Sequence, residues 1–194
     1  MMNLKLRFEW LILFLLPAVL GASGVDGRLV DAARKPDKVT VRALLRQRVN
    51  VNVPDVDGTT ALYWAAYWDD LETAELLLRA GASVKAANRY GITPLALASV
   101  NGSAAMIETL LKADADPNTA MAEGETVLMA AARTGKVEAV KALLVRGAKV
   151  NAVETWRGQT ALMWAAAEGN TAVVDALIEN GADVHARAKG GFTP

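Results

Sequence analysis

Residues 158–166 read Gly158-Gln159-Thr160-Ala161-Leu162-Met163-Trp164-Ala165-Ala166, and the same pattern occurs at three earlier places. The related stretches are Gly58-Thr59-Thr60-Ala61-Leu62-Tyr63-Trp64-Ala65-Ala66, Gly91-Ile92-Thr93-Pro94-Leu95-Ala96-Leu97-Ala98 and Gly124-Glu125-Thr126-Val127-Leu128-Met129-Ala130-Ala131-Ala132. The recurring threonines are Thr60, Thr93, Thr126, Thr160 and Thr193, spaced 33, 33, 34 and 33 residues apart. A period held this closely over five copies indicates a stacked array of one small structural unit.

A second marker, a pair of aliphatic residues, recurs at the same period. The pairs are Leu44-Leu45, Leu77-Leu78, Leu110-Leu111, Leu143-Leu144 and Leu177-Ile178. Four of them are followed three residues later by Gly81-Ala82, Asp114-Ala115, Gly147-Ala148 or Gly181-Ala182. The combined Thr-x-Leu-x-x-Ala-Ala and Leu-Leu-x-x-Gly-Ala pattern resembles the ankyrin repeat over about residues 27–194. The resemblance implies an all-α fold, an ankyrin-repeat solenoid of stacked helix-turn-helix units with short β-hairpin loops.

The period divides the chain into units. We expect a signal peptide at 1–23, a degenerate N-terminal capping repeat at 24–54, repeats at 55–87, 88–120, 121–153 and 154–187, and the start of a further, truncated repeat at 188–194. The first repeat lacks the threonine and the hairpin glycine and has a polar surface, as a terminal unit requires. The repeat at 154–187 has one extra residue before Gly158, which should lengthen its hairpin.

The N-terminus has the composition of a secretory signal peptide. Lys5 and Arg7 precede an apolar run at 10–20, and small residues follow at 21–24. The run is shorter than the roughly 20 residues that a membrane-spanning helix needs, so we expect cleavage after Ala22 or within two residues of it. The alternative is an uncleaved membrane anchor. Cleavage predicts a periplasmic or secreted protein, similar to exported bacterial ankyrin-repeat proteins, with no stable membrane insertion afterwards.

The composition argues against several classes of function. The chain has 21 basic and 21 acidic residues, so no excess of positive charge points to nucleic acid. It has no cysteine and one histidine, His185, which we place in a hairpin. No phosphate-binding loop, dinucleotide fingerprint or nucleophile motif is present. We therefore predict no enzyme activity and no catalytic, cofactor-binding or metal-binding residues.

The resemblance implies recognition of a protein partner through the concave face, made by first helices and hairpin tips. We expect Trp64 and Trp164 to belong to the core between repeats, because they occupy equivalent places inside first helices. Other aromatic and polar residues fall at helix ends or hairpin tips. The predicted partner-binding residues are Tyr67, Trp68, Arg89, Tyr90, Ile92, Glu123, Glu125, Trp156, Arg157 and Gln159. The alternative for Tyr67 and Trp68 is that they fill the gap to the next hairpin.

We expect a monomeric, non-catalytic scaffold. Because the last segment, 189–194, opens a unit and stops before its helices, we expect the sequence to be a fragment of a longer protein. The alternative to an independent scaffold is that the array is the targeting part of a larger enzyme that continues beyond Pro194. A further alternative is a protective, chaperone-like scaffold without a fixed partner.

Overall fold

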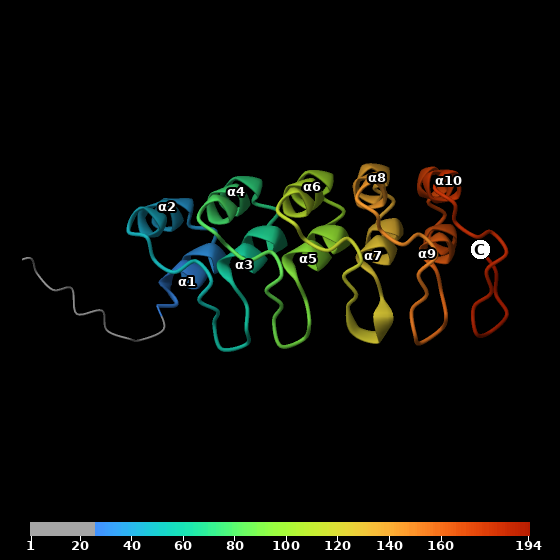
Figure 1. Cartoon of the computed structure of the whole chain (residues 1–194), viewed down its shortest axis with the longest axis horizontal. Coiled ribbons are helices and arrows are strands. Elements are labelled where there is room, and N and C mark those ends of the chain that lie inside the picture. Colours follow the sequence, from blue (N-terminus) through green and yellow to red (C-terminus); the bar gives the residue numbers. More distant parts are fainter. Residues whose placement is uncertain (1–25) are drawn as a thin grey trace, which may run out of the picture.

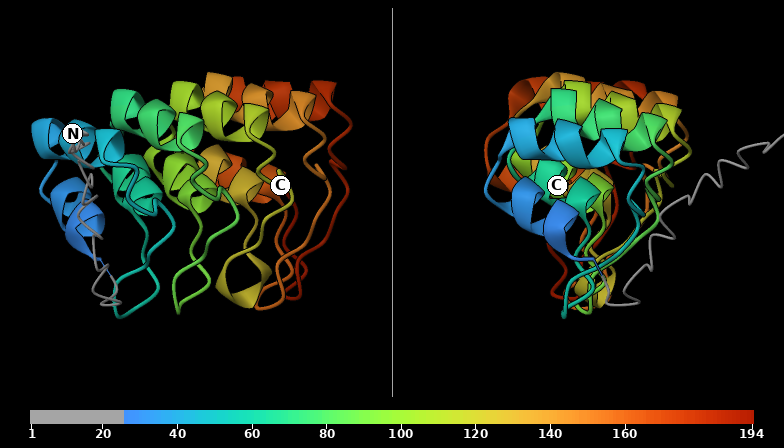
Figure 2. Two further views of the ribbon diagram at one scale, coloured as in Figure 1. Left: turned by 60° about the vertical axis from the view of Figure 1, so that its left-hand side comes forward. Right: turned by 90° about the vertical axis from the view of Figure 1, so that its left-hand side faces the viewer.

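The computed structural model describes residues 26–194, which form two rows of short helices joined by long hairpin-like loops (Figure 1). The first helices of the pairs are α1 (Arg28–Arg34), α3 (Ala61–Tyr67), α5 (Pro94–Asn101), α7 (Val127–Arg133) and α9 (Ala161–Ala167). The second helices are α2 (Lys38–Arg46), α4 (Leu71–Arg79), α6 (Ala104–Lys112), α8 (Val137–Val145) and α10 (Thr171–Glu179). The views in Figure 2 show that all the loops project from the same side of the stack. The expected all-α solenoid is confirmed.

Each of α3, α5, α7 and α9 begins at one of the recurring threonines. The hydroxyl oxygens of Thr60, Thr93, Thr126 and Thr160 accept hydrogen bonds of 3.2–3.4 Å from the backbone N–H three residues later. A cap of this kind satisfies one of the four N–H groups that a helix start leaves without a partner. Because the first helices have only seven or eight residues, capping and packing must stabilise them.

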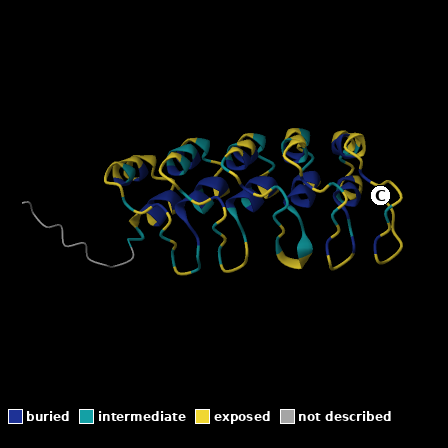
Figure 3. Cartoon of the chain, viewed as in Figure 1, coloured by how far each residue is buried: buried dark blue, intermediate teal, exposed yellow. Residues whose placement is uncertain are grey.

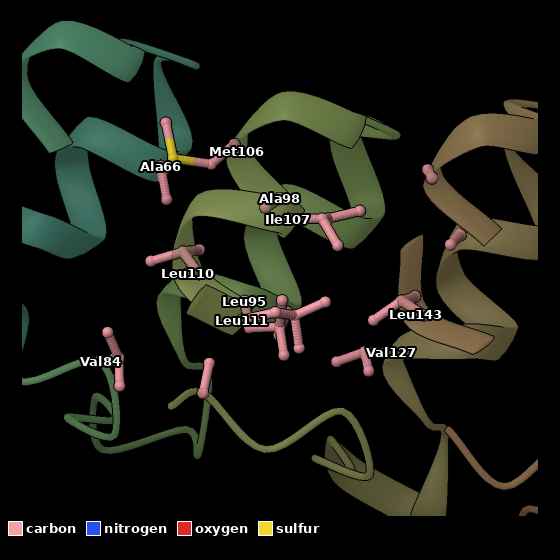
Figure 4. Close-up of a cluster of buried hydrophobic side chains, with 14 of the residues drawn as sticks. Ala66, Val84, Leu95, Ala98, Met106, Ile107, Leu110, Leu111, Val127 and Leu143 are labelled. Carbon is pink, nitrogen blue, oxygen red and sulfur yellow. The ribbon is translucent and has the colours of Figure 1, made fainter. Parts of the chain in front are cut away.

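The core lies between the two rows and continues from one helix pair to the next (Figure 3). Leu62, Leu95 and Leu128 are at most 1% exposed, and the alanines beside them allow neighbouring helices to approach closely. Side chains of successive pairs meet in this layer, as in the close-up of Leu111, Val127 and Leu143 (Figure 4). The N-terminal pair takes part too: Leu29 is only 2% exposed, while the charged residues of α1 face solvent.

Five loops, here called hairpins I to V, precede the threonine positions. They comprise residues 55–59, 88–92, 121–125, 154–159 and 188–192, and each is closed by a hydrogen bond of 2.7–3.1 Å from its first N–H to its last carbonyl. They contain little regular strand, since one isolated bridge, Ala120 to Thr126, is present among the described residues. Hairpin IV is one residue longer than the other four, in agreement with the extra residue before Gly158.

No helix within residues 26–194 has the length and apolar character needed to cross a membrane. A further short 3₁₀ helix, η1 (Ala122–Gly124), forms the tip of hairpin III. The predicted signal peptide at 1–23 lies outside the described residues.

Candidate functional site

The predicted partner-binding residues lie in two places rather than in one row. Tyr67 ends α3 and Trp68 follows it, at the end of the helix remote from hairpin I. Seven helical residues span about 10 Å, which separates these two rings from the hairpins. The other predicted residues, Arg89, Tyr90, Ile92, Glu123, Glu125, Trp156, Arg157 and Gln159, all lie in hairpins II, III and IV.

Four of the predicted aromatic side chains are well exposed. Tyr67 and Trp68 are each 48% exposed, Tyr90 is 64% exposed and Trp156 is 62% exposed. The two hairpin aromatics each carry an arginine guanidinium over the ring, Arg89 at 5.1 Å from Tyr90 and Arg157 at 4.1 Å from Trp156. Such stacking holds both partners in a defined orientation without burying them.

The aromatic rings of α3, together with Trp68 just beyond its end, form a continuous edge-to-face series. Tyr63 and Trp64 have centroids 5.6 Å apart, Trp64 and Tyr67 5.5 Å, and Tyr67 and Trp68 4.8 Å, with interplanar angles of 74–85°. The Trp68 indole N–H also donates a 3.0 Å hydrogen bond to the carbonyl of Arg34, the last residue of α1. Trp68 therefore ties α3 to the preceding first helix while half of its side chain stays exposed.

Trp64 and Trp164 are half-buried and pack against the core, as expected for residues between repeats. Each lies under an arginine that ends the preceding first helix: Arg34 is 5.3 Å from Trp64, and Arg133 is 5.1 Å from Trp164. Neither indole N–H has a hydrogen-bond partner among the described residues, although both nitrogens are buried. Trp64 and Trp164 thus pack against the core and also carry an arginine guanidinium over the ring.

Hairpins I, II and IV each contain a side-chain acceptor for their own backbone. The carboxylate of Asp55 accepts from Asp57 N–H at 3.1 Å, and the Asn88 side-chain oxygen accepts from the N–H groups of Tyr90 and Ile92 at 3.0 Å. In the longer hairpin IV, the Glu154 side chain, which has one methylene more than Asp55 or Asn88, accepts from the backbone N–H groups of its own hairpin. These acceptors hold the loop backbone in its turn.

Glu154 is 4% exposed and accepts from three backbone N–H groups, those of Trp156 (2.6 Å), Arg157 (2.9 Å) and Gln159 (2.8 Å). Burial raises the pKa of the Glu154 carboxyl, but these N–H donors and the charge of Lys189 outweigh burial, so the pKa lies below its ordinary value. Glu154 is therefore a buried anion at neutral pH.

Backbone hydrogen bonds link most neighbouring hairpins. Arg89 N–H donates to Asp57 C=O at 2.8 Å and joins hairpins I and II. Thr155 N–H donates to Glu123 C=O at 2.6 Å and joins hairpins III and IV, and a 2.8 Å bond between residues 189 and 157 joins hairpins IV and V. Within residues 26–194, no backbone hydrogen bond joins hairpin II to hairpin III.

Hairpin III also differs from hairpins I, II and IV in its first residue, although hairpin V, which begins with Ala188, lacks a side-chain acceptor too and is still bonded to hairpin IV. Met121 occupies the place of Asp55, Asn88 and Glu154, and its side chain cannot supply the carboxylate or amide oxygen that these residues provide. Hairpin III instead turns through η1, with Glu123 at a φ of 60°. Aligning the units by their 33-residue period shows this difference at Met121, but the different turn of hairpin III was not predicted from the sequence.

Asparagines form a second set of links between neighbouring helix pairs, also missed from the sequence. The Asn52 side chain donates to Gly81 C=O at 3.0 Å and accepts from Ser83 N–H at 2.7 Å. Asn118 and Asn151 make the same two bonds to the following pair. The equivalent position between them is Lys85, which makes neither bond.

The described residues contain no group of three or more His, Asp or Glu side chains arranged to hold a metal ion. His185 is exposed and lies in the turn between α10 and hairpin V rather than in a hairpin. The exposed side chains of the candidate residues are aromatic, arginine and carboxylate groups on stacked helix pairs and hairpins.

A stack of capped helix pairs with projecting hairpins defines a helical-repeat solenoid. The chain belongs to the ankyrin-repeat family: the family model "Ankyrin repeats (3 copies)" matches residues 29–121 and 114–188. The resemblance seen in the sequence is thereby confirmed. Arrays of this family are generally protein–protein interaction modules and are typically non-catalytic. A search of curated proteins found no match to the chain.

Proposed function

We propose that this protein is a non-catalytic scaffold that binds a partner protein on the concave face formed by its first helices and hairpins. The observation that carries the proposal is the exposure of Tyr67, Trp68, Tyr90 and Trp156, at 48–64%, on structural elements that stack in register. Aromatic and arginine side chains contribute most often to binding energy at protein interfaces.

The geometry supports a broad contact. The hairpin residues border one side of the first helices, and Tyr67 and Trp68 border the other. Between these borders lie the half-buried rings of Trp64 and Trp164 with their arginines. A partner segment that crosses the first helices would therefore meet aromatic and cationic groups throughout its path.

Trp68 and Trp156 provide the test. A double variant, Trp68→Ala with Trp156→Ala, should lose capture of partner protein from the exported fraction of the source organism, measured by quantitative pull-down. Because the Trp68 N–H bonds to Arg34, Trp68→Ala should also cost about 0.5–1.5 kcal/mol of stability. Trp156 donates no such side-chain bond, so Trp156→Ala alone should leave the thermal melt nearly unchanged.

Trp68→Phe is the matched control, since it keeps an aromatic ring but removes the N–H. Retained capture with a small loss of stability is expected. If the double variant captures its partner as well as the unaltered chain does, the binding face has been misassigned.

We further propose that the scaffold acts outside the cytoplasm, either in the periplasm or as a secreted protein. Support comes from the basic residues, the apolar run and the small residues at 5–24. N-terminal sequencing of the exported protein should find a start within two residues of Ser23. An intact Met1 in a membrane fraction would favour the anchor instead.

A further inference from the structure

Equivalent residues of the five first helices form a row at the C-terminal ends of these helices. The members of this helix-end row are Arg34, Tyr67, Val100, Arg133 and Ala167, spaced 33, 33, 33 and 34 residues apart. All five are exposed. The first helices stand side by side in Figures 1 and 2, so the row crosses the stack on the face to which the proposed function assigns the partner.

The middle of the helix-end row is apolar. Tyr67 is 48% exposed and Val100 is 43% exposed, and Leu97, about one helical turn before Val100, is half-buried against the core. The Asn101 side chain donates a 3.3 Å hydrogen bond to the carbonyl of Tyr67, which fastens the end of α5 to the end of α3. Tyr67 and Val100 therefore offer neighbouring apolar surfaces that a partner could cover.

Arg133, the next member of the row, is held by two contacts with the following helix pair. Its guanidinium lies 5.1 Å from the centroid of the Trp164 ring. Its backbone carbonyl accepts a 3.1 Å hydrogen bond from the Asn170 side chain. A side chain that is already held in place loses less conformational freedom when it binds a partner.

The charge of Arg133 is not neutralised by another side chain. Arg34, the equivalent residue of α1, forms ion pairs with Asp31 at 3.6 Å and with Asp55. Arg133 forms no ion pair within residues 26–194, and neither does the exposed Glu168, which follows α9. The planar guanidinium fork matches the two oxygens of a carboxylate. The row thus places one unneutralised cation beside an apolar surface.

We propose that Arg133 binds a carboxylate of the partner protein, on a segment that also places aliphatic or aromatic side chains against Tyr67 and Val100. The guanidinium N–H groups of Arg133 donate to the carboxylate oxygens. Because Val100 and Arg133 are successive members of the row, the acidic and apolar side chains lie close together on the segment. The inference rests on the proposed function, since it specifies the chemistry of the partner at one part of the same face.

The test starts from a random linear peptide library displayed on phage and selected on the full chain. Enriched peptides should share an aspartate or glutamate together with an aliphatic or aromatic residue. Each is then synthesised with a fluorescent label and titrated by anisotropy against the full chain. Replacing the acidic residue by its amide, asparagine or glutamine, should weaken binding about tenfold.

Variants of the chain locate the contact. Arg133→Gln should weaken binding to a similar extent, and the amide peptide should lose nothing further in this variant, as for two members of one interaction. Arg133→Lys keeps the charge without the planar fork and should recover only part of the affinity. Arg146→Gln is the matched control, because it removes an exposed arginine at the end of α8 in the same helix pair, and it should have no effect. Circular dichroism melts check that each variant is folded.

Three outcomes would overturn the inference: no enrichment, enriched peptides without an acidic residue, or affinities indifferent to Arg133→Gln. Its failure is distinguishable from failure of the proposed function. Peptides that are lost with Trp68→Ala but retained with Arg133→Gln would remove the Arg133 contact and keep the wider binding face. A chain that selects no peptide but still captures its partner through Trp68 and Trp156 would do the same.

Discussion

Replacing Lys85 by asparagine should stabilise the array. Asn52, Asn118 and Asn151 each make two hydrogen bonds to the next helix pair, whereas Lys85 makes none at the equivalent turn. The bonding groups that an asparagine at 85 would meet are Asp114 C=O and Asp116 N–H. Neither forms a backbone hydrogen bond in the described part of the chain. Both partners of the missing link are therefore already in place.

The magnitude follows from the existing links. Each hydrogen bond has a net value of about 1 kcal/mol, and ordering an exposed asparagine side chain consumes part of that. Because Lys85 forms no ion pair among the described residues, its removal costs little. A net gain of about 1–2 kcal/mol should raise the melting temperature by about 2–8 °C in a chain of this size. Asn118→Ala should lower it by a similar amount.

Urea and thermal melts followed by circular dichroism at helix wavelengths measure both changes. Lys85→Ala is the control, because it removes the lysine without adding the amide. If Lys85→Asn and Lys85→Ala have equal stability while Asn118→Ala is destabilising, the turn at 84–85 does not present its side chain as the other three turns do. The reasoning from repeat equivalence would then be refuted.

Two further predictions concern buried groups. Glu154→Gln should cost about 1–3 kcal/mol at neutral pH, because an amide supplies one acceptor oxygen where a carboxylate supplies two. The pKa of Glu154 is lowered in the folded state, so the carboxylate's contribution is complete above its ordinary value of 4.5 and is lost as the pH falls through the folded-state value. Urea melts from pH 7 downward should show the variant and the unaltered chain converging in acid, and a difference that persists would contradict this assignment. Ile107→Ala, at a fully buried site, should cost about 2–5 kcal/mol, whereas Ile178→Ala, at a site 44% exposed, should cost about 1 kcal/mol or less; equal losses in denaturant melts would argue against the packing described.

The features predicted from the sequence are those that recur. Thr60 and its counterparts mark helix starts because a side-chain cap acts on residues three positions away. Leu62 and its counterparts mark the core because burial on one helix face leaves a periodic pattern. The sequence also predicted that the extra residue before Gly158 lengthens one hairpin, because an insertion in a loop leaves the flanking helices in place.

The features that escaped prediction depend on departures from the repeat or on contacts between units. Met121 lacks the oxygen acceptor of Asp55, Asn88 and Glu154, and the turn of hairpin III through η1 is seen only in the structure. Trp68 was predicted to contact a partner, but its bond to Arg34 is visible only when the neighbouring helix is in place. The separation of Tyr67 from the hairpins likewise follows from the direction of α3, which periodicity alone does not specify.

The uneven distribution of links has a mechanical consequence. The α5–α6 pair and the α7–α8 pair share the two bonds of Asn118. Within residues 26–194 their junction has no hairpin bond and no counterpart of the bonds that Trp68, Asn101 and Asn170 donate to the end of the preceding first helix. In a stack pulled from its two ends, the same force passes through every junction in series. The junction with the fewest directional bonds yields first, while its apolar layer still resists separation. Under tension we therefore expect the junction between the α5–α6 and α7–α8 pairs to lengthen before the others.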